Sequence, residues 1–250
     1  MADEVDGLRF EQKHGKARVR VARVWRKEDG RYFFVEWNVS ITLLSDCLPA
    51  YVFDDNSDIV ATDSMKNTVY VKAKECSEVL SVEDFAIELG RHFTSFYQKV
   101  TTAIVKVVEK PWERVCIDGQ PHEHGFKLGS EKHITEVTVK KSGALRVTAG
   151  IEGLALLKTT KSGFEGFIRD KYTLLPETRE RMLATEVSAS WRFPDISSIQ
   201  LTMPNLHFLP VNLSSKDSAT IVKFDDDVYT PTDEPHGTIE ASLSRLRSKM

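Results

Sequence analysis

The sequence lacks paired cysteines, long apolar runs and an apolar leader. Cys47, Cys76 and Cys116 are widely spaced and form no C-x-x-C pair. This argues against a disulfide framework or a zinc knuckle and predicts three reduced thiols. No apolar stretch approaches the roughly 20 residues of a membrane-spanning helix. The start, Met1-Ala-Asp-Glu, is acidic, so we expect neither a membrane partner nor a secretory signal.

The sequence also lacks a large excess of charge of either sign. The 34 Lys and Arg residues nearly balance 37 Asp and Glu residues, which leaves a net charge of −3 and argues against a nucleic-acid partner. A chain of 250 residues that is 41% hydrophobic and 28% charged has an ordinary globular composition, with room for one large domain or two smaller ones.

The familiar nucleotide and hydrolase motifs are absent as well. There is no phosphate-binding G-x-x-x-x-G-K-[ST] loop, no G-x-G-x-x-G fingerprint and no G-x-S-x-G elbow. His122 and His124 could supply two metal ligands from one face of a strand. A third ligand at useful spacing is missing, so a solvated loop is the favoured interpretation and we expect no metal.

The first half of the chain has a β-β-α-α-β-β pattern. Alternating apolar residues predict a hairpin of strands over 17–25 and 33–43. A helix is expected from about Asp63. A second follows Ser81, with Asp84 at capping-box spacing. Its apolar stripe comprises Phe85, Leu89 and Phe93. Strands are then expected over 102–108 and near 125–127.

The second half begins in the same way but loses the helices. A hairpin over 133–140 and 145–151 leads through a loop, 162–177, to a strand at 183–191. Pro194 and Asp195 then turn directly into a strand at 196–203. A short helix from Thr238 to Arg247 is expected near the end. The fold class is therefore α+β with antiparallel sheets.

Three polar groups are candidates for chemistry. Thr62, Asp63 and Ser64 stand just ahead of the first helix, where free N–H groups favour an anionic or electron-rich ligand; ordinary helix capping is the alternative. Asn205 and His207 are expected on the same face of a strand. They could form a polar pair that moves a proton, or His207 could be a structural histidine with its hydrogen bonds satisfied. Lys16 is an ordinary lysine unless burial lowers its pKa.

Together these pieces resemble the urate oxidase (uricase) family. The segment 154–181 is similar to that family's signature, and the matching positions are Lys158, Thr159, Thr160, Ser162, Phe164, Phe167, Tyr172, Leu175 and Arg181. Further similarity lies at 15–16, 60–64, 112–119 and 204–207. The resemblance covers nearly the whole chain and is closest to plant uricases.

The resemblance implies a tunnelling fold (T-fold) of two β-β-α-α-β-β modules, placed here at 1–130 and 131–250. Family members assemble as homotetramers with sites between subunits. One chain would supply Lys16 and Thr62, and its neighbour would supply Phe164, Arg181 and His207.

The resemblance also implies the chemistry. Lys16, Thr62 and His207 correspond to the family's catalytic proton relay. The family's substrate-binding residues correspond to Thr62, Asp63, Phe164, Arg181 and Asn205. By this resemblance Phe164 would stack on the purine and Arg181 would bind it with two hydrogen bonds from its guanidinium. Asn205 would lie beside the oxygen site. The implied reaction oxidises urate with O₂ and water to 5-hydroxyisourate and hydrogen peroxide in purine catabolism. No cofactor, flavin or metal, is expected.

The chain departs from the family after Trp191. There the family has several tens of residues, with both helices of the second module and a glutamine that clamps urate. Without them we expect an exposed apolar patch, and weak or absent turnover. The patch would comprise Val187, Ala189, Trp191, Ile199, Leu201 and Met203.

The sequence ends in Ser248-Lys249-Met250, which resembles a Ser-Lys-Leu peroxisomal address and implies an import receptor as partner and a peroxisomal location. An alternative function is that of a non-catalytic uricase-like subunit that co-assembles with full-length chains. A pterin-acting T-fold enzyme is a further alternative, against which the signature around Phe164 argues.

Overall fold

The computed structural model describes residues 3–5, 8–193, 210–217, 222–225, 228–230 and 237–241. The chain divides into two compact units. The first comprises residues 1–150 and 191–209, and the second comprises residues 151–190 and 210–250. The long strands β9 and β10 contribute residues to both units. The predicted module boundary at residues 130 and 131 concerns a repeat in the sequence and stays a prediction.

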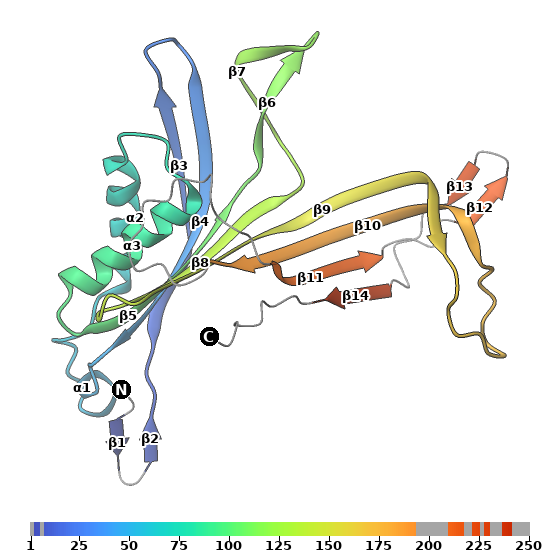
Figure 1. The fold of residues 1–250 in the computed structure, drawn as a ribbon. Helices are drawn as coiled ribbons and strands as arrows, with labels where there is room; N and C mark the ends of the chain where they lie inside the picture. Colours follow the sequence, from blue (N-terminus) through green and yellow to red (C-terminus); the bar gives the residue numbers. More distant parts are fainter. Residues whose placement is uncertain are drawn as a thin grey trace, which may run out of the picture. The chain divides into compact units, whose positions relative to one another are not determined.

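The first unit is an antiparallel sheet with two long helices on one face (Figure 1). The strands of the sheet follow one another in the order β9-β8-β5-β4-β3. The elements of this unit are β1 Asp3–Val5, β2 Leu8–Phe10, β3 His14–Arg26, β4 Tyr32–Ser45, α1 Pro49–Val52, α2 Thr62–Glu75, α3 Val82–Phe96, β5 Val100–Glu109, β6 Trp112–Ile117, β7 Gln120–Leu128, β8 Lys132–Lys140 and the start of β9, Leu145–Phe164.

The predicted first hairpin is confirmed by the pairing of β3 with β4. Val21 lies opposite Trp37, and Ile41 lies opposite Val105 of β5 on the other side of β4. Trp37 is fully buried, and its ring stacks on Phe85 of α3 with centroids 4.2 Å apart. Alternation in the strands therefore directs one row of apolar side chains toward the helices.

Helix α3 also follows its sequence signals. The Ser81 hydroxyl accepts the backbone N–H of Asp84 at 3.0 Å and donates to the Asp84 carboxylate at 2.7 Å. The apolar stripe lies against the sheet with no exposed surface at Phe85, Leu89 or Phe93. These contacts confirm both the cap and the buried face.

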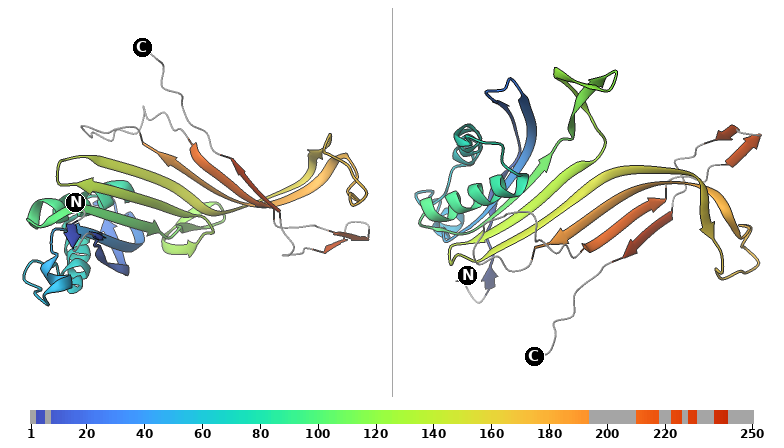
Figure 2. Two further views of the ribbon diagram at one scale, coloured as in Figure 1. Left: turned by 90° about the horizontal axis from the view of Figure 1, so that it is seen from below. Right: turned by 45° about the horizontal axis from the view of Figure 1, so that its top comes forward.

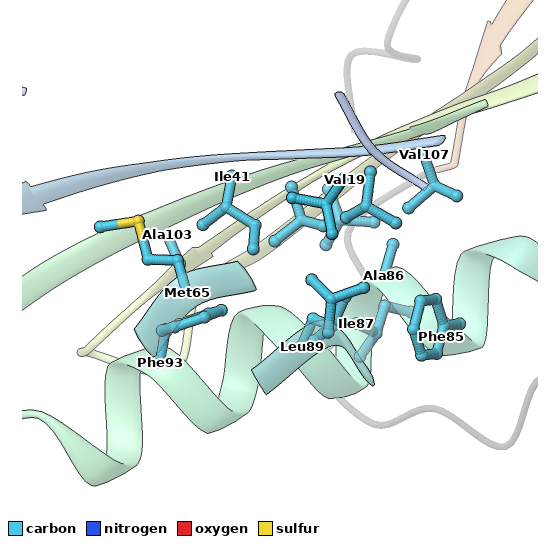
Figure 3. Close-up of a cluster of buried hydrophobic side chains, with 14 of the residues drawn as sticks. Val19, Ile41, Met65, Phe85, Ala86, Ile87, Leu89, Phe93, Ala103 and Val107 are labelled. Atoms are coloured by element: carbon cyan, nitrogen blue, oxygen red, sulfur yellow. The ribbon is translucent and has the colours of Figure 1, made fainter. Parts of the chain in front are cut away.

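Helix and sheet approach one another closely at Gly90 of α3. A methyl group there would lie 2.5 Å from a side-chain carbon of Val139 in β8. The core between the two layers combines residues of β3, β4, α2, α3 and β5, as Figure 3 shows for Ile41, Met65 and Phe93. This core fixes α2, and with it the first turn of that helix, against the sheet.

The second unit contains strands and loops but no helix within its described residues (Figure 2). Its strands lie in the order β9-β10-β11-β14, with β12 and β13 as a separate pair. The remaining elements are β10 Thr178–Arg192, β11 Pro210–Asp217, β12 Val222–Asp225, β13 Val228–Thr230 and β14 Gly237–Ala241. The segment 165–177 joins β9 to β10 as the predicted loop.

The predicted helix from Thr238 to Arg247 is wrong in its described part. Residues 237–241 form β14, in which Ile239 pairs with Ser215 of β11. Pairing with the open edge of β11 satisfies the backbone groups of β14, and this tertiary contact overrides a short helical pattern. Strand β6 at Trp112–Ile117 was not predicted from the periodicity.

Three further predictions concern the apolar patch, the cysteines and membrane-spanning helices. Val187, Ala189 and Trp191 are half-buried in β10, whereas Ile199, Leu201 and Met203 lie outside the described residues, as does the predicted strand 196–203. All three cysteines are free thiols. Within the described ranges, no helix is long and apolar enough to cross a membrane.

Candidate active site

Lys16 is positioned by an irregularity in β3. Gly15 passes so close to β4 that a Cβ atom there would lie 2.1 Å from the carbonyl oxygen of Ile41. Directly after Lys16 the pairing shifts, because Lys16 lies opposite Ile41 while Val19 lies opposite Val39. The extra residue forms a bulge in which Arg18 adopts a φ of 59°.

The bulge decides which side of the sheet Lys16 faces. Beyond it, Val19 and Trp25 are buried under the helices. Before it, His14 and Lys16 are half-buried while Gly15 between them is exposed. Lys16 therefore shares the helix-bearing face with Val19, although the two lie three residues apart. Within the described residues, the Lys16 ammonium forms no hydrogen bond or close ion pair.

Thr62 and Asp63 form the start of α2 instead of preceding it. The N-cap is Ala61, and no side chain caps the helix. The capping interpretation of this cluster is therefore wrong. The exposed hydroxyl of Thr62 has no hydrogen-bond partner in the described part of the chain, and the free N–H groups of the first turn lie beside it.

Asp63 is held by its own helix. Its carboxylate accepts from Lys66 at 2.7 Å and from Asn67 at 2.8 Å. The hydrogen bond and charge of Lys66 hold the pKa of Asp63 below its ordinary value, with smaller contributions from Asn67 and from the charge of Lys16. Lys16 and the start of α2 both belong to the first unit, in which α2 packs against β3, and they make up one site fragment.

A second fragment lies in the second unit. The Arg181 guanidinium of β10 lies over the Phe164 ring at the end of β9, with its central carbon 5.4 Å from the ring centroid. Phe164 is 43% exposed. The enclosed Nε of Arg181 has no hydrogen-bond partner among the described residues. An aromatic face and an unpaired planar cation are thus presented together.

Phe164 is itself supported by a ring whose role the sequence did not reveal. Phe167 stacks on it with centroids 4.7 Å apart and planes inclined by 11°, and Arg169 lies 5.4 Å from the Phe167 ring. The F-x-x-F spacing of Phe164 and Phe167 within the signature segment is the sequence feature that could have indicated this stack. This stack leaves Phe164 with one face covered by protein.

The remaining predicted site residues cannot be placed. Asn205, His207 and the tripeptide Ser248, Lys249 and Met250 lie outside the described residues. Of the two candidate metal ligands, His122 accepts backbone N–H groups of His124 and Gly125 through Nδ1. No group of three potential metal ligands occurs within the part of the chain that the structure describes.

Comparison with solved structures defines the class of protein. The crystal structure of uricase from Arthrobacter globiformis matches with a TM-score of 0.76 and 30% sequence identity, covering 96% of each chain. The antiparallel sheet with helices on one face is accordingly the tunnelling fold that was predicted.

Sequence comparison then gives the family. The uricase family model matches residues 12–138 and 147–196, more than half of the chain. Uricase-2 isozyme 2 of Canavalia lineata is 62% identical, and uricase of Arabidopsis thaliana is 59% identical, each aligned over the whole of both chains. The chain belongs to the uricase family and is an enzyme of the urate oxidase type.

The same alignments show a shortfall in length. The 250 residues of this chain are spread over 302 aligned positions against the Canavalia lineata relative, which leaves 52 positions without a counterpart here. The family-model match ends at residue 196, shortly after Trp191.

Proposed function

We propose that this chain oxidises urate with O₂ and water to 5-hydroxyisourate and hydrogen peroxide, as a step of purine breakdown. The observation that carries the proposal is the unpaired guanidinium of Arg181 over the half-exposed ring of Phe164. A flat purine anion fits this pair, because its ring stacks on the aromatic face and its oxygen and nitrogen atoms accept from the planar cation.

The reaction balances without a further redox partner. Urate gives two electrons to O₂, which takes up two protons and leaves as hydrogen peroxide. A hydroxyl from water then bonds to the oxidised purine carbon. What the protein must supply is orientation and proton transfer. In this proposal no flavin or metal takes part.

Proton transfer is assigned to Lys16, Thr62 and His207. The half-buried Lys16 and the hydroxyl of Thr62 support this assignment, since neither side chain has a hydrogen-bond partner within the described residues and both are free to contact a ligand. His207 would extend the relay, and Asn205 would lie beside the oxygen site. Both assignments rest on the family resemblance alone.

We further propose that the complete site forms between copies of the chain in a homotetramer. The loop between β9 and β10 exposes apolar side chains to an unusual degree, with Ile168 94%, Tyr172 76% and Leu174 92% exposed. Burial against a neighbouring subunit would remove this surface from water. Peroxisomal import through Ser248-Lys249-Met250 is part of the same proposal.

The rate of this chain is expected to be low. The 52 unmatched positions and the end of the family match at residue 196 support the loss of a segment after Trp191. A glutamine clamp for urate would be lost with it. Misplacement of a substrate by small distances can lower a rate by about 100-fold.

The direct test is an assay of the purified full chain for uric-acid absorbance decay and peroxide release, beside the Arabidopsis thaliana relative. We expect turnover at least about 100-fold slower than that of the relative. Any residual rate should disappear in Lys16→Met. A rate equal to the relative's would contradict the impairment, and a rate unchanged by Lys16→Met would contradict the assigned relay.

A second candidate function is that of a non-catalytic subunit within assemblies of full-length chains. The exposed loop residues and the shortened sequence favour it together, since the surface for assembly is retained while a substrate clamp is missing. Mixing the chain with a full-length relative separates the two functions. Mixed oligomers with activity reduced in proportion to the added chain would support the second.

A further inference from the structure

His14 connects the strand that carries Lys16 to the segment that carries Thr62. It lies two residues before Lys16 on the same face of β3. Its Nε2 lies 3.1 Å from the backbone carbonyl oxygen of Val60, which precedes Thr62 by two residues. A carbonyl oxygen can only accept, so the imidazole carries its proton on Nε2.

The contact spans 46 residues of sequence and joins two parts of one site fragment. Val60 is 6% exposed, so its carbonyl is held at a buried position next to the start of α2. No side chain caps that helix start. The His14 contact is therefore a side-chain tether for the approach to Thr62 from the strand that bears Lys16.

The other ring nitrogen shows that the imidazole is enclosed. Nδ1 of His14 is buried and has no hydrogen-bond partner among the described residues. A buried polar atom without a partner is unfavourable, so hydrogen bonding by both ring nitrogens does not explain this orientation of the ring. The geometry of the strand, with Gly15 against Ile41 and the bulge after Lys16, places the ring there.

We infer that His14 is a positioning residue for the Lys16–Thr62 pair. By holding the Val60 carbonyl, it fixes the distance between the lysine ammonium and the threonine hydroxyl. It touches neither substrate nor reacting atoms in this role. The inference rests on the proposed function for its catalytic readout, while its structural readout is independent of activity.

Gln12, a half-buried residue two positions before β3, provides a matched control. Its Nε2 donates to the carbonyl oxygen of Ser45 at 2.7 Å, which is the same kind of side-chain contact at the next position outward. Ser45 ends β4 and does not lead to Thr62. Loss of the Gln12 contact therefore tests for general loosening of the chain where it enters β3.

The experiment compares His14→Phe, His14→Gln and Gln12→Leu in the full chain. Steady-state peroxide release gives kcat and KM for urate, and hydrogen exchange measured by mass spectrometry reports on residues 58–66. We expect His14→Phe to lower kcat about ten-fold and to change KM by less than about two-fold. His14→Gln keeps a donor of similar reach and should recover kcat to within about three-fold.

Exchange over 58–66 should become faster in His14→Phe and stay unchanged in Gln12→Leu. An equal loss of kcat in Gln12→Leu, or no recovery in His14→Gln, would overturn the inference. If the unmodified chain releases no peroxide, the proposed catalysis fails by itself. The exchange data then decide, since unchanged exchange in His14→Phe overturns the tether and faster exchange confined to that variant supports it.

Discussion

Arg181 shows how much of the proposed binding chemistry depends on one side chain. Its guanidinium lies over Phe164 and forms no ion pair within the described residues, although Arg179 two positions earlier is paired with Glu165 at 2.8 Å. The two arginines share a strand and differ in what they contact. Charge alone therefore does not distinguish a candidate ligand-binding residue from a surface residue here.

Replacing Arg181 by lysine keeps the charge and removes the planar fork. We expect Arg181→Lys to raise KM for urate about ten-fold, equivalent to about 1.4 kcal/mol, because an ammonium cannot stack or bind two acceptors in one plane. The exposed Arg179 serves as the control, and Arg179→Lys should leave KM within about two-fold. If Arg181→Lys and Arg179→Lys gave equal KM values, the planar guanidinium of Arg181 would not be what binds urate.

Residue types and spacing indicated where candidate groups are, but not how each is oriented. The signature segment predicted Phe164 and Arg181, and the structure brings them together. Nothing in the sequence predicted that Ala61 would be the N-cap of α2 and that the Thr62 hydroxyl would therefore not cap the helix. The Phe167 stack and the His14 contact also depend on chain geometry over several residues, which local patterns do not determine.

At the scale of elements, Glu36 joins three strands. It lies on β4 and is 8% exposed. Arg20 of β3 forms an ion pair with the Glu36 carboxylate at 2.6 Å, and Lys110 forms another at 2.8 Å. The indole N–H of Trp112 in β6 also donates to this carboxylate, at 3.0 Å. The hydrogen bonds from Lys110 and Arg20 lower the pKa of Glu36 from 4.5 to about 2. The base of the β6–β7 hairpin is thereby fixed to the sheet.

This contact predicts a pH dependence of stability. A lowered pKa means stabilisation that is complete above the ordinary value of 4.5 and is lost as the pH falls toward about 2. Near neutral pH, Glu36→Gln should reduce the free energy of unfolding by about 2–3 kcal/mol. The difference from the unmodified chain should shrink as the pH falls toward 2.

Denaturant unfolding across this pH range measures the effect. The exposed Asp29, whose pKa is lowered mainly by a hydrogen bond from Arg31, is the control. Asp29→Asn should leave the pH profile of stability nearly unchanged. A Glu36→Gln deficit that persists undiminished at pH 2 would show that ionisation of Glu36 is not its source.

Elements with a buried apolar face were predicted well and the others poorly. Helix α3 and the β3–β4 hairpin follow periodic patterns that burial enforces. The stretch from Thr238 had a weak helical pattern, and its described part pairs as β14 with the edge of β11. Edge pairing depends on a partner strand distant in sequence, so periodicity could not reveal it.

For the whole molecule, the shortened length is the feature with the largest consequence. If a lost segment limits the rate, restoring it should restore turnover. We expect that inserting the corresponding segment of the Canavalia lineata relative after Arg192 raises kcat/KM for urate by about 100-fold. Peroxide release measures the change.

The matched control is a Gly/Ser insertion of the same length at the same position. It lengthens the chain without supplying helices or a clamp, and it should leave kcat/KM unchanged within about two-fold. Equal gains from both insertions would mean that spacing alone was limiting. No gain from the native segment would place the limitation elsewhere in the chain.

The bulge after Lys16 lets even and odd positions of β3 share one face. Residues 14 and 16 lie on the helix-bearing face before it, and residues 19, 21, 23 and 25 lie on that face after it, so inward positions change from even to odd numbers. If β3 paired regularly with the same residues, His14 and Lys16 would turn to the opposite face. Deleting Ala17 or Arg18 would instead leave Lys16 and Val19 two residues apart, the spacing at which a regular strand keeps both on one face. Loss of the bulge would thus remove the lysine from the site only where the number of residues stays unchanged.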